Sequence, residues 1–196
     1  MKKITLILFA IFAFSMTANA QESNDANGFT KGDMFVSGNI GYSSESTPDN
    51  AKTHEFRVSP RVGYFLTDFF AVGGELGYAY NDSEASNGAT TAKNSTYTIG
   101  VFGRYYLLPG SKFSIFGELG LGFGATKNMY DDWTNGINAA FSPGISYFLG
   151  EHFALEASFG ILSYNSVSPE GSNGSTDSFN IGIDLENINF GIIYKF

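Results

Sequence analysis

The chain has 196 residues, no cysteine, two histidines and a formal net charge of −8. These values exclude a disulfide framework, a thiolate metal site, a cysteine nucleophile and electrostatic binding to nucleic acid. Charged residues make up 15% of the chain, against roughly 25% in average soluble domains, while aromatic residues reach 16%. The sequence therefore lacks the polar surface of an ordinary water-soluble globule.

The first twenty residues have the layout of a secretory signal peptide. Lys2 and Lys3 precede an apolar run over residues 4–16, and an A-x-A pattern ends at Ala20. The apolar run is shorter than the roughly 20 residues of a membrane-spanning helix. We expect a cleaved signal peptide over 1–20, a loose polar N-terminal leader over 21–32, and a single domain over 33–196.

From Asp33 onward, apolar residues recur at every second position, which is the period of a β-strand. About eight such segments of roughly 10 to 14 residues follow one another, a length suited to tilted membrane strands. Their alternating apolar positions run over 34–42, 56–66, 70–80, 97–107, 113–123, 137–149, 153–161 and 188–196. The apolar residues over 179–185 lie at odd-numbered positions, whereas those over 188–196 lie at even-numbered ones. We therefore expect a bulge near 184–187, or an extension of the strand outside the membrane.

The connecting segments alternate in length. Those near 67–69, 108–112 and 150–152 are tight turns, whereas those near 44–53, 82–94, 127–135 and 165–178 are longer and polar. Short turns on one rim and long loops on the other are typical of barrels in the outer membrane of Gram-negative envelopes. The sequence therefore predicts an all-β fold, an eight-stranded antiparallel up-and-down transmembrane β-barrel in the outer membrane.

The competing fold is a soluble, lipocalin-like barrel with its apolar face inward, because alternation alone does not say which face is inside. The opposite face of the strands, which mixes apolar and polar residues, decides between the soluble and the membrane barrel. It carries Phe35, Phe65, Phe102, Tyr106 and Phe116, many glycines and few charges. Such a face suits a narrow interior better than a water-facing surface, so we expect the apolar face to meet lipid.

A closed barrel of about eight strands has an interior just wide enough for its own side chains. If Leu66 pairs with Phe70, Arg61 lies opposite Glu75. Buried charges need partners, because an unmatched charge costs several kcal/mol. We therefore expect an ion-pair network that fills the lumen and fixes the strand register, made of Arg57, Arg61, Arg104, Glu75, Glu118 and Glu156.

The same reasoning gives a register for the next hairpin. If Leu107 pairs with Phe113, Arg104 lies opposite Phe116 and diagonal to Glu118, within reach of long side chains.

Candidate catalytic groups are sparse. His54 with Asp82 and Ser83 is the one set that resembles the site of a lipid-modifying barrel, and a lipid-modifying outer-membrane enzyme remains a third functional alternative. His152 with Glu151, and Asp131 with Asp132, are interpreted as solvated turn and loop residues, and the run over 117–124 continues a strand, so it is not a phosphate-binding loop. We expect no catalytic residues, no metal site and no cofactor.

Several segments carry a family resemblance over nearly the whole mature chain. They are 63–68 (GYFLTD), 70–75 (FAVGGE), 116–120 (FGELG), 142–144 (SPG) leading to 147–149 (YFL), and above all the ending 189–196 (NFGIIYKF). In these segments the chain resembles small, porin-like outer-membrane β-barrel proteins of the OmpA/OmpX type, and especially the outer membrane protein beta-barrel domain family. The resemblance implies that Ile192, Tyr194 and Phe196 form the signal read by the outer-membrane assembly machinery.

Together these patterns predict a monomeric outer-membrane barrel with a structural or surface-interaction role, in envelope integrity or loop-mediated contact. The main alternative is a narrow channel for ions or small solutes. Expected partners are outer-membrane lipids and lipopolysaccharide, with the barrel-assembly machinery and periplasmic chaperones during biogenesis, and no nucleic acid.

Overall fold

The structure is a computed structural model that describes residues 28–49, 51–171, 174–182 and 188–196. The expected signal peptide, the leader before Gly28 and the bulge expected near 184–187 lie outside these residues. No helix in the described part of the chain is long and apolar enough to cross a membrane. The strands are β1 (Met34–Ser46), β2 (Lys52–Phe65), β3 (Phe70–Glu84), β4 (Thr90–Tyr106), β5 (Phe113–Lys127), β6 (Trp133–Phe148), β7 (Phe153–Ser158), β8 (Leu162–Pro169), β9 (Thr176–Ile181) and β10 (Asn189–Lys195).

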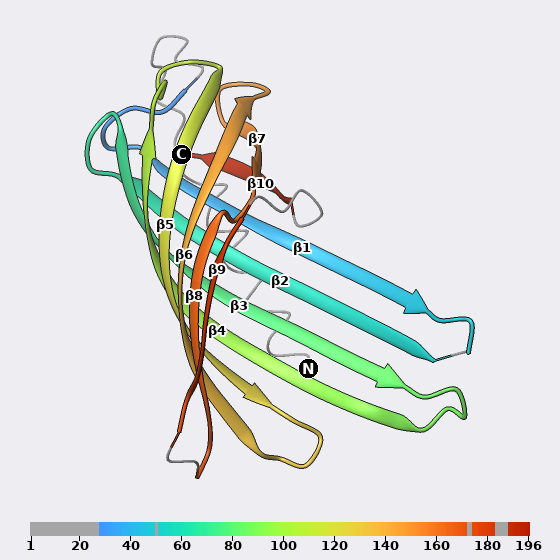
Figure 1. The fold of residues 1–196 in the computed structure, drawn as a ribbon. Helices are drawn as coiled ribbons and strands as arrows, with labels where there is room; N and C mark the ends of the chain where they lie inside the picture. The colour runs from blue at the N-terminus through green and yellow to red at the C-terminus, as the bar shows by residue number, and fades with distance from the viewer. Residues whose placement is uncertain (1–27, 50, 172–173, 183–187) are drawn as a thin grey trace, which may run out of the picture.

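These strands form an eight-stranded antiparallel barrel, as the sequence predicts. The seventh position in the barrel is shared by β7 and β8, which lie one after the other along β6. The eighth is shared by β10, which pairs with β7, and β9, which pairs with β8. Since β10 also pairs with β1, and β5 pairs with both β4 and β6, the sheet closes on itself (Figure 1).

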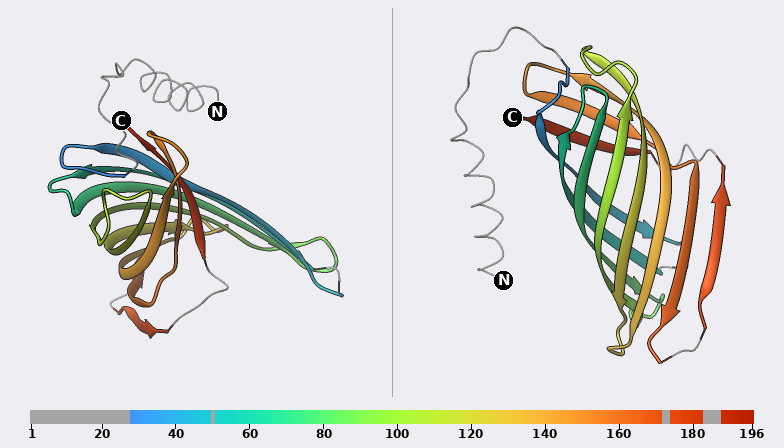
Figure 2. Two further views of the ribbon diagram at one scale, coloured as in Figure 1. Left: turned by 90° about the horizontal axis from the view of Figure 1, so that it is seen from above. Right: turned by 90° about the vertical axis from the view of Figure 1, so that its left-hand side faces the viewer.

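Closure lies at the end of the barrel that holds the C-terminus. There β1 pairs with β10 over four residue pairs, from Phe35 opposite Lys195 to Gly38 opposite Ile192. Beyond Gly38, β1 pairs only with β2 among the described residues, and β9 pairs only with β8. The tips of β1–β4 and of β8–β9 consequently diverge at the opposite end (Figure 2).

A bulge separates β7 from β8 opposite Pro143. Gly144 is opposite Ser158 and Phe141 is opposite Leu162, so three residues, 159–161, face two on β6. Proline has no N–H to donate to the ladder, and such positions favour bulges. Because of the extra residue, odd-numbered residues point outward in β7 and even-numbered residues point outward in β8. The single alternation expected over 153–161 therefore ends with β7, at Ser158.

The outer connections are shorter than the sequence predicts. Residues 47–51, 85–89, 128–132 and 170–175 join the strands there, and the polar segments beside them are strand. Pairing continues to Ser83 opposite Ala92 and Lys127 opposite Trp133. The structure thus corrects the expectation of long loops. The N–H and C=O groups of these polar segments form hydrogen bonds across the hairpins, so the segments continue the strands.

The apolar face points outward all round the barrel. Val101, Leu121 and Ile137, at mid-height, are more than half exposed. Aromatic rings border this apolar surface at both ends, as they do in membrane barrels. Tyr97 contacts Tyr78 and Trp133 near the outer end, with ring centroids 5.3 and 6.4 Å apart. An apolar outward face rules out the lipocalin-like alternative.

Candidate functional site in the barrel interior

Strand register brings the predicted lumen charges to one level of the barrel. Arg61 lies opposite Glu75, which confirms the predicted register of β2 and β3. Arg104 lies directly opposite Glu118, so the predicted pairing of Arg104 with Phe116 is wrong. The connection over 107–112 is the reason, because the Leu107 N–H bonds to the Ile115 carbonyl, 2.9 Å away, and not to Phe113. This shift of two residues keeps the same faces inward.

Five of the six predicted residues form one ion-pair network. Arg61 Nε lies 3.1 Å from Glu75 Oε2, and Arg61 Nη2 lies 2.5 Å from Glu118 Oε1. Arg104 Nε donates to Glu118 Oε2 over 2.8 Å. Arg104 Nη2 donates to Glu156 Oε1 over 3.2 Å, and Arg104 Nη1 pairs with Glu156 Oε2. Arg104 thus bridges carboxylates from β5 and β7, on opposite sides of the β6 strand.

Arg104 is fully buried, and its remaining contacts are aromatic. Its guanidinium carbon lies 4.0 Å from the Phe116 ring centroid, and Nη1 donates to the Tyr106 hydroxyl over 2.9 Å. Arg61 stacks on Phe102 in the same way, at 4.2 Å. Gly144 makes room for this layer, because a Cβ atom there would overlap the Phe116 ring. The guanidinium groups are held by carboxylates at their edges and rings at their faces.

Arg57 does not belong to the network, which corrects the prediction. It pairs with Glu55 on its own strand, and its side chain is 56% exposed. Four residues separate it from Arg61 along β2, which is about 13 Å at the rise of a strand. The inward side chains it can reach therefore lie nearer the outer end than Glu118 and Glu156.

Phe29 is the interior residue that the sequence reasoning missed. Its ring is fully buried, with centroids 4.5 Å from Phe65, 4.9 Å from Phe148 and 5.1 Å from Tyr106. Phe35 completes the surround at 5.7 Å. Phe29 is the one aromatic residue in the polar stretch 21–32, which is the signal that could have marked it.

The backbone around Phe29 is held as firmly as its ring. The Phe29 N–H donates to the Pro109 carbonyl over 2.7 Å, and Lys195 Nζ donates to the Gly28 carbonyl over 2.7 Å. The Lys31 N–H donates to Asp68 Oδ1 over 2.8 Å. Residues 28–32 are therefore docked into the barrel mouth, unlike the loose leader expected from their polarity.

The predicted assembly-signal residues lie on the outward face of β10 and its end. Ile192 is 60% exposed. The Tyr194 ring contacts Phe153 and Phe196 edge-on, both at 5.0 Å, and the Phe196 N–H donates to the Met34 carbonyl. These side chains are presented to the surroundings at the junction of the first and last strands; their recognition by assembly machinery remains a prediction.

The candidate catalytic set is split between two faces. His54 is opposite Asp82 on adjacent strands, with both on the outward face. Ser83 follows Asp82 directly, so its side chain points to the other face, where it approaches Thr53 Oγ1 at 3.3 Å. His152 Nδ1 lies 2.9 Å from the Lys195 carbonyl, and Asp131 pairs with Lys127. The His54, Asp82 and Ser83 side chains do not meet as a catalytic triad requires.

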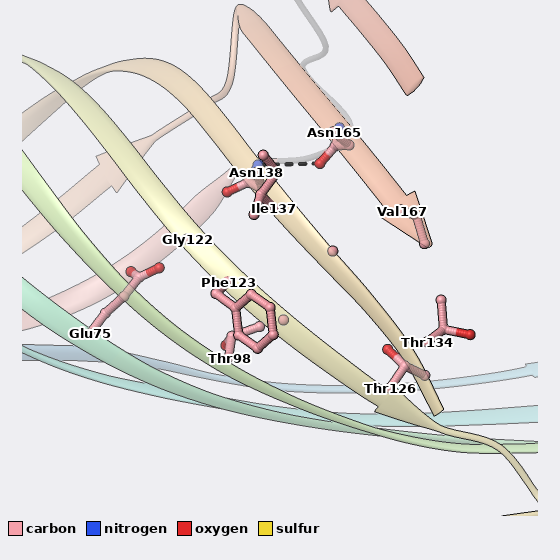
Figure 3. A pocket seen from close by; sticks show the side chains of 12 residues that line it. Glu75, Thr98, Gly122, Phe123, Thr126, Thr134, Ile137, Asn138, Asn165 and Val167 are labelled. Carbon is pink, nitrogen blue, oxygen red and sulfur yellow. Dashed lines mark hydrogen bonds between the residues drawn. The ribbon is translucent and has the colours of Figure 1, made fainter. Parts of the chain in front are cut away.

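A chamber of about 250 Å³ lies in the outer half of the barrel, beyond the ion pairs. Glu75 reaches it from β3, and Asn138 Nδ2 donates to Asn165 Oδ1 across its far wall over 3.3 Å (Figure 3). Polar side chains and glycines make up most of the lining, and Phe123, Ile137 and Val167 are its larger apolar members. The lining residues are Glu75, Thr98, Gly122, Phe123, Gly124, Thr126, Thr134, Gly136, Ile137, Asn138, Asn165 and Val167.

An outward apolar surface with aromatic borders, on a closed antiparallel barrel, defines an integral outer-membrane β-barrel protein. The chain belongs to the outer membrane protein beta-barrel domain family, whose model matches residues 6–196. A comparison with curated protein sequences finds no match to the chain.

Two solved structures share the fold. The outer membrane protein OprG from Pseudomonas aeruginosa is 18% identical with a TM-score of 0.50, and the match covers 88% of this chain and 99% of OprG. Neisserial surface protein A is 16% identical with a TM-score of 0.51, and that match covers 85% of this chain and all of the neisserial chain. Membership of the outer membrane protein beta-barrel domain family places the protein in the outer membrane.

Proposed function

We propose that the protein is a structural or surface-contact component of the outer membrane, with a lumen closed in its periplasmic half by charged and aromatic side chains. The observation that carries this proposal is the fully buried Arg104, which binds Glu118 and Glu156 above a layer of packed rings. In bacterial outer-membrane barrels the short turns face the periplasm. On that orientation, Phe29 and its neighbouring rings occupy the periplasmic mouth.

The energetics favour a closed interior. An ion that crosses the barrel must separate guanidinium groups from carboxylates that are buried with them, and breaking such a pair costs about 3–5 kcal/mol. The aromatic layer around Phe29 adds apolar contacts that water does not replace. A narrow channel for ions or small solutes, the alternative function, requires this layer to move.

The outer hairpin ends support a role in surface contact. They extend beyond the apolar belt, and their carboxylates outnumber their cations among the described residues: Glu45, Asp49, Glu55, Asp82, Glu84, Asp131, Asp132, Glu170 and Asp177 against Lys52, Arg57, Lys93 and Lys127. We propose that they present an acidic surface outside the cell. The separation of Ser83 from His54 and Asp82 supports a non-enzymatic role.

We further propose that lipids and lipopolysaccharide surround the monomeric barrel, and that periplasmic chaperones and the assembly machinery bind it during biogenesis. The exposed position of Ile192, Tyr194 and Phe196 at the strand junction supports the last of these.

Planar-bilayer conductance tests the closed lumen. We expect no large discrete current steps from the wild-type barrel at moderate voltage. The variant Phe116→Ala removes the ring beneath Arg104 and is expected to conduct measurably more, while Leu119→Ala, on the outward face of the same strand, is not. Heat-modifiable migration on detergent gels verifies that each barrel is folded. Wild-type steps as large as those of open porins contradict the proposal.

A further inference from the structure

The ion-pair network has one more carboxylate than it has guanidinium groups. Arg104 is shared by Glu118 and Glu156, and Arg61 is shared by Glu118 and Glu75. Glu75 has the weakest hold on this network, with a single ion pair at 3.1 Å and a side chain 37% exposed. Arg61 is thus divided between two carboxylates, and Glu75 is the member of the network that also borders the outer half of the lumen.

The chamber described above lies in that outer half, and its lining offers oxygen atoms. Thr98 contributes a hydroxyl, and Asn138 presents a carbonyl oxygen, since its hydrogen bond to Asn165 uses the amide nitrogen. Among the described residues that line the chamber, none is a lysine, arginine or histidine. The lining thus has acceptors and one carboxylate, whose cationic partner, Arg61, lies outside the lining and is shared with Glu118.

Glycines keep the chamber open. A Cβ atom at Gly122 would lie 3.4 Å from Asn138 Oδ1, and one at Gly124 would lie 3.4 Å from the Thr98 methyl. At Gly100, a Cβ would lie 3.0 Å from Glu75 Oε1. A larger residue at Gly100 would crowd the carboxylate of Glu75, and larger residues at Gly122 or Gly124 would occupy the chamber.

We propose that the chamber binds a small primary ammonium ion, with Glu75 as its counter-ion. An ammonium group donates three hydrogen bonds, which matches a carboxylate, a hydroxyl and an amide oxygen. Calcium instead requires six to eight oxygens, with several carboxylates among them. A volume of about 250 Å³ holds a short alkyl chain beside Val167. The net charge of −8 raises the local concentration of cations at the mouth.

Solution NMR on the folded barrel in nonionic detergent micelles tests this site. The probe is n-butylammonium at low ionic strength, with n-butanol as the neutral comparison. We expect the amide resonances of Gly100, Gly122 and Gly124 to shift saturably with butylammonium and not with butanol. No saturable shift in the wild-type protein overturns the proposal.

Three variants locate the binding group. Glu75→Gln removes the charge at nearly constant shape and is expected to weaken binding at least tenfold. Gly122→Leu fills the chamber, leaves the charge in place and is expected to do the same. Glu55→Gln, the matched control, removes a carboxylate on β2 that pairs with Arg57 outside the chamber lining and is expected to retain wild-type affinity. Heat-modifiable migration verifies folding of each.

Equal weakening in Glu55→Gln and Glu75→Gln would show that only the general acidity of the outer end attracts the probe, and overturns the proposal. Unchanged affinity in Glu75→Gln does so too. These outcomes are independent of bilayer conductance, so the site and the closed lumen can fail separately.

Discussion

Replacement of Phe29 by alanine should release residues 28–32 from the barrel mouth. The ring is fully buried against Phe35, Phe65, Tyr106 and Phe148. Burial of a phenylalanine side chain contributes about 2–3 kcal/mol, and aromatic pairs add about 0.5–1.5 kcal/mol. The segment precedes the first strand and can lift away, so we expect the loss to appear as undocking and not as an unfolded barrel.

Amide hydrogen exchange reports this undocking directly. The N–H of residue 29 donates to the Pro109 carbonyl over 2.7 Å, and it exchanges only when the segment opens. A loss of about 3 kcal/mol lowers its protection by roughly two orders of magnitude, since each 1.4 kcal/mol is tenfold. Phe69→Ala is the control, because that ring faces outward on a turn and stacks on Tyr105.

The Phe69→Ala variant should retain wild-type protection at residue 29. Unchanged protection in Phe29→Ala would refute the reasoning, because it would show that backbone hydrogen bonds hold the segment without the ring.

Two further perturbations address the network and biogenesis. Arg104→Ala leaves Glu118 and Glu156 without their shared counter-ion and should lower the free energy of unfolding by about 3–5 kcal/mol, measured from the urea dependence of the folded band on gels. Arg104→Lys should recover only part of this, because an ammonium does not reproduce the two-sided guanidinium contacts; full stability of Arg104→Ala would contradict the network's role. Phe196→Ser should slow insertion by purified assembly machinery severalfold, whereas Phe190→Ser, also outward on the last strand, should not. Equal slowing in both would show a general need for apolar surface and no terminal signal.

Local patterns were enough to predict the barrel and part of its interior. Period-two alternation assigns every inward and outward residue within a strand, because successive side chains point to opposite faces. The pairing of Arg61 with Glu75 was also predictable, since the connection over 66–69 is short and fixes the register of its hairpin. The sequence likewise identified Arg104, Glu118 and Glu156 as inward charges.

Other features depend on the folded barrel. The register of β4 and β5 follows from the conformation of residues 107–112, which composition does not specify. The bulge opposite Pro143 arises because its missing N–H faces the neighbouring strand, and that neighbour is known only from the sheet. Arg57 stays outside the ion-pair network because it lies too far along β2 for its side chain to reach Glu118 and Glu156. The alternation of faces alone does not show this distance.

The sequence by itself determined the alternating faces, the approximate number of strands and the set of inward charges, because these depend on neighbours within a few residues. Only the tertiary structure decided that Arg104 joins Glu118 to Glu156, that Arg57 stays apart from them, and that Phe29 enters the mouth. The cavity that receives its ring is assembled from β1, β2, β4 and β6, and it exists only once those strands have closed around it.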